Sequence, residues 1–189
     1  MAYTTRRVGP VPALGPPAAP LSCGVACGTE RWLVKTLADP DRDQVAQTPE
    51  RTSVAALARL PRPAQLPEAA RTAGAERKRF VVEAYLAGWD DERDRDIHLI
   101  LADPDDQTVT LIAEIPDPEC SGACASGFAQ AYAEARSALE AGLARPNPED
   151  RPIRVEVTGV GFFDRNHGQT GAAPNFIELH PVLSLRFLE

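Results

Sequence analysis

Three histidines are the side chains of this 189-residue chain best suited to chemistry near neutral pH. They are His98, His167 and His180, and Glu178 stands two residues before the last of them. Side chains two apart share one face of a strand, so Glu178 and His180 are expected to point the same way. Three imidazoles and a carboxylate form a valid ligand set for zinc or another divalent metal. Since no compact motif such as HExxH occurs, local hydrogen bonding by each histidine is the competing interpretation.

Two carboxylates are candidates for acid–base work beside these histidines. Glu114 has the strand parity of Ile112 and Thr110, and Glu178 accompanies His180. A carboxylate near a histidine can act as general base, for example on a metal-bound water. It can equally be a structural hydrogen-bond acceptor, and both interpretations stay open.

A polar, glycine-containing loop precedes the last predicted strand. It runs from Asp164 to Asn175 and reads DRNHGQTGAAPN. Glycines let backbone approach a ligand, and the polar side chains offer donors and acceptors. The same residue types also satisfy a loop's own backbone. The candidate binding residues are His98, Asp164, His167, Gln169, Asn175, Glu178 and His180.

Four cysteines form two equally spaced pairs, Cys23-x3-Cys27 and Cys120-x3-Cys124. Two disulfides, a four-thiolate zinc site and free thiols are the three alternatives. If disulfides form, the nested pairing Cys27–Cys120 with Cys23–Cys124 is the natural one, because two antiparallel segments can make both without crossing.

Two further motifs give little indication of function. The acidic segment 90–96 lacks the glycine and the distal glutamate of an EF-hand, so we expect a solvated turn. Gly159 and Gly161 lack the third glycine of a dinucleotide fingerprint, and no helix pattern follows them.

Composition narrows the function classes. The formal net charge of −7 argues against non-specific binding to nucleic acid or to anionic membranes. No apolar run reaches the roughly 18 residues of a membrane-spanning helix. Residues 1–28 are rich in proline and lack periodicity, which predicts a disordered leader without a clear signal peptide. One domain is expected over residues 29–189, with an oligomeric state that the sequence leaves open.

The elements that must position these residues follow from hydrophobic periodicity. Alternation predicts strands at 30–37, 80–89, 96–101, 108–115, 153–163 and 176–188, and a period near 3.6 predicts helices at 53–60 and 128–143. Thr52 and Ser126 are the expected helix caps, and Pro181 is expected to kink the last strand. From residue 80 on, the order is three strands, one helix and two strands. This is the plan of a five-stranded OB-like barrel, whose loops after strands one and four flank the binding face. An α+β sandwich is the alternative.

Several motifs together resemble an uncharacterised bacterial family whose members are mostly hypothetical proteins, many apparently exported. They are Cys27–Thr36 (CGTERWLVKT), Asp96–Leu99 (DIHL), Ala113–Pro116 (AEIP), Gly159–Asp164 (GVGFFD), His167–Gly171 (HGQTG), Ala173–Asn175 (APN) and Ile177–Val182 (IELHPV). The resemblance covers residues 27 to about 185. It implies export and a bridge between Cys27 and Cys120, and it implies little about activity. Cys23 and Cys124 are additions to the family pattern.

Three hypotheses follow for function. The first is a binding module for a small or extended ligand on one polar face of the barrel. The second is a metal-dependent hydrolase, of a nuclease-like kind, with His98, His167 and His180 as ligands and Glu114 or Glu178 as base. The third is a purely structural polar cluster. In each case His167, Glu178 and His180 are expected in one cluster, with His98 at its edge.

Overall fold

The computed structural model describes residues 23, 25–145 and 152–188. Its longest strand, β2 (Arg79–Asp91), alternates buried and half-buried side chains over most of its length. Phe80, Val82, Ala84 and Leu86 point into the core, which is the period-2 pattern of a strand with one buried face. The first half of β2 pairs with one strand of the barrel and its second half with another, and the second pairing shifts its register between Leu86 and Gly88.

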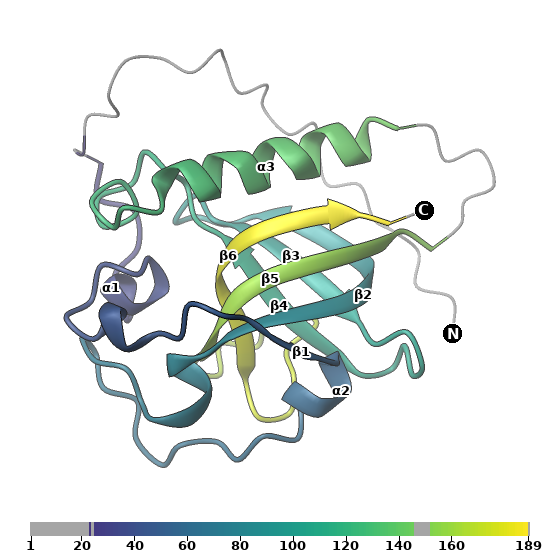
Figure 1. Ribbon diagram of the computed structural model, residues 1–189, viewed down its shortest axis with the longest axis horizontal. Coiled ribbons are helices and arrows are strands. Elements are labelled where there is room, and N and C mark those ends of the chain that lie inside the picture. Colours follow the sequence, from purple (N-terminus) through teal and green to yellow (C-terminus); the bar gives the residue numbers. More distant parts are fainter. Residues whose placement is uncertain (1–22, 24, 146–151, 189) are drawn as a thin grey trace.

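Five strands close into a barrel (Figure 1). The other four are β3 (Ile97–Ala102), β4 (Thr110–Ile115), β5 (Arg154–Phe163) and β6 (Ile177–Phe187). Their order is β2–β3–β4–β6–β5, and β5 pairs back onto β2. Only the β4–β6 pair is parallel within the barrel. Helix α3 (Ala129–Leu143) lies between β4 and β5 in sequence. The mainly β, OB-like barrel expected from the sequence is therefore confirmed.

Helix α3 covers one side of the barrel and packs along β6 (Figure 1). Tyr132, Ala135 and Leu139 are buried, as their spacing predicts. The expected capping role of Ser126 is indirect: its hydroxyl accepts from the Phe128 amide, one residue before the helix begins.

The N-terminal third corrects two expectations. The segment 30–37 is not a strand but contains the single helical turn α1 (Trp32–Lys35). Four residues are too few to distinguish the two periodicities. The predicted helix at 53–60 is the shorter α2 (Val54–Leu57), whose cap is Ser53 rather than Thr52. The sequence analysis did not anticipate β1 (Glu50–Thr52), which pairs in parallel with β2, or the 3-10 turns η1 (Arg42–Gln44) and η2 (Gly74–Arg77).

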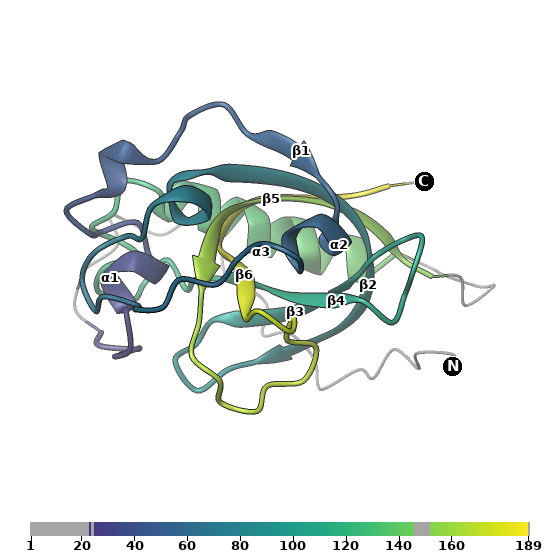
Figure 2. The same ribbon diagram turned by 90° about the horizontal axis from the view of Figure 1, so that it is seen from below.

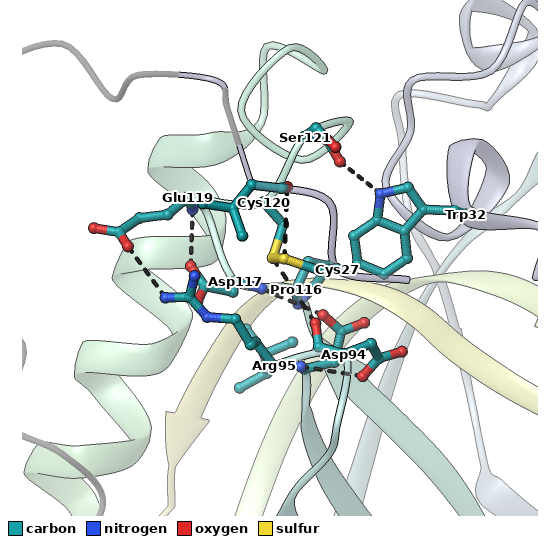
Figure 3. Close-up of a disulfide and its surroundings, with 12 residues drawn as sticks. Cys27, Trp32, Asp94, Arg95, Pro116, Asp117, Glu119, Cys120 and Ser121 are labelled. Carbon is teal, nitrogen blue, oxygen red and sulfur yellow. Dashed lines mark hydrogen bonds and ion pairs between the residues drawn. A yellow bond between two sulfur atoms is a disulfide. The ribbon is translucent and has the colours of Figure 1, made fainter. Parts of the chain in front are cut away.

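Two disulfides tie the start of the described chain to the segment before α3. Cys27 is bonded to Cys120 (Figure 3) and Cys23 to Cys124, which confirms the nested pairing. The indole of Trp32 donates to the Ser121 carbonyl beside them. Segment 23–38 is thereby fixed against the outside of the barrel.

Two expectations concern regions that this structure covers only in part. Most of the predicted leader, residues 1–22 and 24, lies outside the described residues. Among the described residues, no helix is both long and apolar enough to cross a membrane.

Candidate functional site

The polar residues singled out above lie on the outer face of the barrel. Ala113 and Ile115 of β4 belong to the barrel core, so Glu114 between them points outward. Ile177 and Leu179 do the same for Glu178 on β6. Although they face away from the barrel interior, both glutamates are buried, because segment 23–38 and the loop 164–175 cover this face.

Glu114 is the centre of a polar cluster formed by Asp96, His98, Glu114, Glu178 and His180. His98 lies opposite Glu114 in the β3–β4 register, and its Nδ1 is 3.1 Å from Glu114 Oε1. The other carboxylate oxygen is 2.9 Å from His180 Nδ1, and His180 Nε2 is 3.1 Å from Asp96 Oδ2. Acid and imidazole therefore alternate along a continuous line from Asp96 to His98.

The cluster divides its charges sharply. Burial alone would raise the pKa of Glu114, but His180, His98 and Lys35 hold it well below its usual value. Burial would lower the pKa of His180, yet the charge of Glu114 and the contact with Asp96 raise it to about 9. Burial together with the charges of Glu114 and Asp164 raises the pKa of Glu178 well above its ordinary value. Near neutral pH the cluster therefore contains an ionised Glu114 and a charged His180, while the pKa of Glu178 is shifted in the direction that favours its protonated form.

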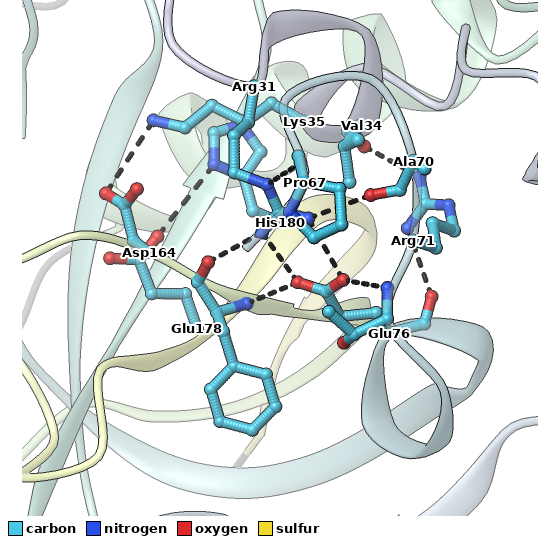
Figure 4. Close-up of polar contacts among 12 residues, drawn as sticks. Arg31, Val34, Lys35, Pro67, Ala70, Arg71, Glu76, Asp164, Glu178 and His180 are labelled. Atoms are coloured by element: carbon cyan, nitrogen blue, oxygen red, sulfur yellow. Dashed lines mark hydrogen bonds and ion pairs between the residues drawn. The ribbon is translucent and has the colours of Figure 1, made fainter. Parts of the chain in front are cut away.

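Lys35 links this cluster to the loop that follows β5 (Figure 4). Its ammonium lies 3.9 Å from Glu114 Oε2 and 3.9 Å from Asp164 Oδ2. Burial would lower the pKa of Lys35, but Glu114 and Asp164 raise it above its normal value, so the side chain remains a cation. The turn α1 thus inserts one positive charge between two carboxylates.

A buried ion pair anchors α1 in this position (Figure 4). Arg31 contacts both oxygens of Glu76, at 2.7 and 3.0 Å, and donates to the Phe163 carbonyl. Arg71 also forms a buried pair, in which its Nε and one terminal nitrogen both donate to Asp39 Oδ2. Both pairs are inaccessible to solvent, and their additional hydrogen bonds offset the cost of burying the charges.

Beside the polar cluster is an open cavity of about 320 Å³. Its walls come from the start of the described chain, from the β2–β3 turn, from β4 and from the loop after β5. The lining residues are Cys27, Thr29, Glu30, Lys35, Glu92, Arg93, Asp94, Glu114, Asp164, His167 and Gln169. The β2–β3 turn and the β5–β6 loop correspond to the two loops that flank the binding face of an OB-fold.

The cavity is acidic. Five lining carboxylates (Glu30, Glu92, Asp94, Glu114 and Asp164) face two cations, Lys35 and Arg93. Asp164 is 2% exposed, and its Oδ1 accepts no hydrogen bond from any described residue. Its Oδ2 accepts from the Gln169 side chain. A buried carboxylate oxygen without a donor is costly, and among the carboxylates of this site Glu178 Oε2 and Asp96 Oδ2 also accept no hydrogen bond from the described residues.

The expected cluster assembles only in part. His98 is the end member of the line that starts at Asp96, so it lies at the edge of the polar cluster as expected, but His167 lies outside it. His167 lines the mouth of the cavity instead, where its Nε2 is 2.6 Å from Glu30 Oε2. Each of the three groups of potential metal ligands among the described residues contains only one histidine, so His98, His167 and His180 do not form a common ligand set.

The other candidates divide between site and scaffold. Asp164 and Gln169 line the cavity, as does Glu114. Asn175 is structural, because its amide donates to the carbonyls of Leu57 and Leu60 at the end of α2. Gly171, at φ 86°, allows the loop to lie directly on Ile100 of β3.

Sequence reasoning did not single out Lys35 as a site residue, and it assigned the whole acidic segment 90–96 to a solvated turn. Glu92 is exposed and Asp94 half-buried, as a solvated turn requires, although both line the cavity. Asp96 is fully buried, which corrects the expectation at that residue. The spacing of the acidic residues alone did not indicate which of them fold inward.

Topology and site together define a class: a small OB-like barrel with an acidic cavity between its two ligand-side loops. In comparisons with protein-family models, with curated proteins and with solved structures, nothing matches this chain. The resemblance to an uncharacterised bacterial family stays a prediction.

Proposed function

We propose that this protein is a binding module for a small cationic ligand, which enters the cavity beside Glu114 and Asp164. The volume of about 320 Å³ suits a small molecule or an ion rather than a folded partner. The excess of carboxylates selects for positive charge, since a cation gains Coulomb energy in a partly desolvated pocket. The position matches the face that OB-folds use for ligands, which is support by analogy of fold.

The observation that carries the proposal is the unpartnered Oδ1 of Asp164. A cluster that served structure alone is expected to satisfy its own buried groups, and much of this site does so. Both oxygens of Glu114 are contacted by imidazoles, and Lys35 is held between two carboxylates. Asp164 Oδ1 is buried without such a contact among the described residues, and a bound cation would supply it.

Isothermal titration calorimetry tests the proposal with five probes: 1,4-diaminobutane, guanidinium, zinc, glucose and succinate. At least one of the three cations is expected to bind with a 1:1 stoichiometry, while the neutral sugar and the dianion give no heat. Asp164→Asn is expected to weaken that binding by about tenfold or more, a loss of about 1.4 kcal/mol.

The matched control is Asp43→Asn, because Asp43 is 95% exposed and does not line the cavity. It removes the same charge and is expected to leave the affinity within about twofold, a change in binding free energy of about 0.4 kcal/mol. Binding of succinate or glucose in preference to every cation would contradict the proposal. So would cation binding that Asp164→Asn leaves unchanged.

An oxidising compartment is part of the same proposal. The two disulfides support it, because disulfides persist in oxidising compartments and are rare in proteins of reducing compartments. The metal-dependent hydrolase stays a prediction, and nothing in the cavity favours it in the form expected. The three histidines proposed as its metal ligands belong to separate groups among the described residues.

A further inference from the structure

We infer that the cation is a divalent transition-metal ion, of the zinc class, held by Glu30, Asp164 and His167 at the mouth of the cavity. This inference rests on the proposed function, because it names the ligand of the same cavity. It replaces the three-histidine site expected from the sequence with one imidazole and two carboxylates.

The three side chains converge from separate parts of the chain. Glu30 lies just before α1, Asp164 directly follows β5, and His167 stands three residues further along the loop. One ligand atom from each lies within 4.8 Å of the others. Their side chains are 23%, 3% and 48% exposed, respectively, so the group extends from the interior to solvent and an ion can reach it.

The atoms not needed for an ion are held by neighbours. Gln169 donates to Asp164 Oδ2 and accepts from the His167 amide, which fixes both residues of the loop. Arg165 NH1 lies 2.8 Å from Glu30 Oε1. Asp164 Oδ1 has no partner among the described residues. Glu30 Oε2 and His167 Nε2 lie 2.6 Å from each other, so an ion would take the place of the contact between these two atoms. Outer contacts of this kind orient ligands in metal sites.

The donor set selects the type of metal. One imidazole and two carboxylates suit zinc and related ions, and three protein ligands leave a position open for water or a further ligand. Calcium and magnesium prefer oxygen ligands alone. Glu30, Asp164 and Glu114 carry three negative charges, which balance a divalent ion together with Lys35, whose ammonium lies 3.9 Å from both Glu114 and Asp164.

The two other groups of potential ligands fit less well. Glu92, His98 and Glu114 form one, but His98 already hydrogen-bonds to Glu114 and to the Thr170 carbonyl. Asp96, Glu114 and His180 form the other, and neither Asp96 nor His180 lines the cavity. Only the group at the mouth combines an unpartnered buried oxygen with access from solvent.

The test uses the full chain with its disulfides intact, stripped of metal with a chelator and titrated with zinc chloride in the calorimeter. One zinc per chain is expected, with much weaker binding of magnesium and calcium. His167→Ala and Asp164→Asn are each expected to reduce zinc affinity by about tenfold or more, whereas Asp43→Asn leaves it unchanged. Cobalt offers a second readout, because its visible absorption bands in the protein should disappear in His167→Ala.

The outcomes separate this inference from the proposed function. If 1,4-diaminobutane or guanidinium binds in an Asp164-dependent manner and zinc does not, the metal is wrong and the cation-binding module stands. Zinc binding that His167→Ala leaves intact also overturns the metal site. If no cation binds, both proposals fail. Circular dichroism of His167→Ala confirms that a loss is local, and the exposed position of this side chain makes an intact fold the expectation.

Discussion

Glu114 and His180 form a buried pair of opposite charges. Each lowers the cost of ionising the other, so Glu114 is an anion and His180 a cation near neutral pH. His180 is fully buried and lies between two carboxylates, Glu114 and Asp96. The ion pair is surrounded by the outer face of the barrel and by α1, so solvent screens it little. The proton on His180 is therefore held more tightly in the folded protein than in the unfolded chain. The free energy of unfolding should for this reason depend on pH.

The pKa of His180 predicts how stability depends on pH. Folding raises that pKa from 6.5 to about 9, so the folded state binds the proton more tightly than the unfolded state. The stabilisation is fully present below pH 6.5 and is lost as the pH rises through about 9. The raised pKa of Glu178 acts in the same direction. Urea unfolding should show a loss of up to about 3 kcal/mol between these limits.

The exposed His167 provides the control for this measurement. His167→Ala should retain the pH-dependent loss, whereas His180→Gln should flatten it, even if that variant is less stable throughout. A wild-type free energy of unfolding that is equal at pH 6.5 and at pH 10 would refute the assigned charge of His180.

At the residue scale, sequence could identify side-chain types but not their partners. Strand parity correctly placed Glu178 and His180 on one face. It did not show that Glu114 would join the two histidines, because that contact depends on the cross-strand register of β3, β4 and β6. The position of His167 was predicted wrongly, because loop residues follow no periodicity and its partner Glu30 is far away in sequence.

At the scale of elements, close packing explains the two glycines of β5, Gly159 and Gly161. In the sequence they resemble an incomplete dinucleotide-binding fingerprint. A Cβ at Gly161 would clash with the Ala75 carbonyl of η2 and approach the Phe80 ring to 2.9 Å. The glycine permits η2 to pack directly on β5, and η2 carries Glu76, the partner of Arg31. The motif therefore helps to position α1 and its Lys35.

Gly161→Ala is accordingly expected to destabilise the protein by about 1–3 kcal/mol, because backbone rather than a flexible side chain must move. Gly88→Ala on β2 is the matched control, since its new methyl group would meet only Ile100 at an ordinary 3.5 Å. That variant should change the free energy of unfolding by less than about 0.5 kcal/mol. Equal effects of the two substitutions in urea unfolding would show that the close approach of η2 to β5 is not needed.

The elements that sequence predicted well are those with long, clean periodicity. The strands from residue 80 onward and α3 appear near their expected places, because each buries one regular face. The segment 30–37 was misassigned because a single turn is decided by tertiary contacts, here the Arg31–Glu76 pair and the packing of Trp32 beside Cys27 and Cys120.

At the scale of the whole molecule, a closed barrel provides the frame and an N-terminal layer makes the site. Figure 2 shows α1 and the chain after it lying outside the strands. Segment 23–38 is held there by two disulfides and by the buried Arg31–Glu76 pair. Cys27 itself lines the cavity, so the cross-link and the candidate ligand site share a wall.

The order of strands and helix along the chain could be predicted from the sequence, whereas the position and the lining of the cavity could not. The cavity forms where four distant segments meet, and each contributes only a few residues. Its acidic character depends on which carboxylates face it: Asp94 lines the cavity, while Asp90 near the end of β2 is exposed and does not. Such a choice is made by the assembled fold and leaves no periodic trace in the chain.

The most direct test of the central claim, that this cavity binds a cation, is a crystal structure of the protein grown with the cation that binds best in calorimetry. The account predicts electron density for that cation inside the cavity, with Asp164 Oδ1 among its contacts and Lys35 still between Glu114 and Asp164. Density for the cation only elsewhere on the surface, or a protein donor bonded to Asp164 Oδ1 in a closed cavity, would contradict it.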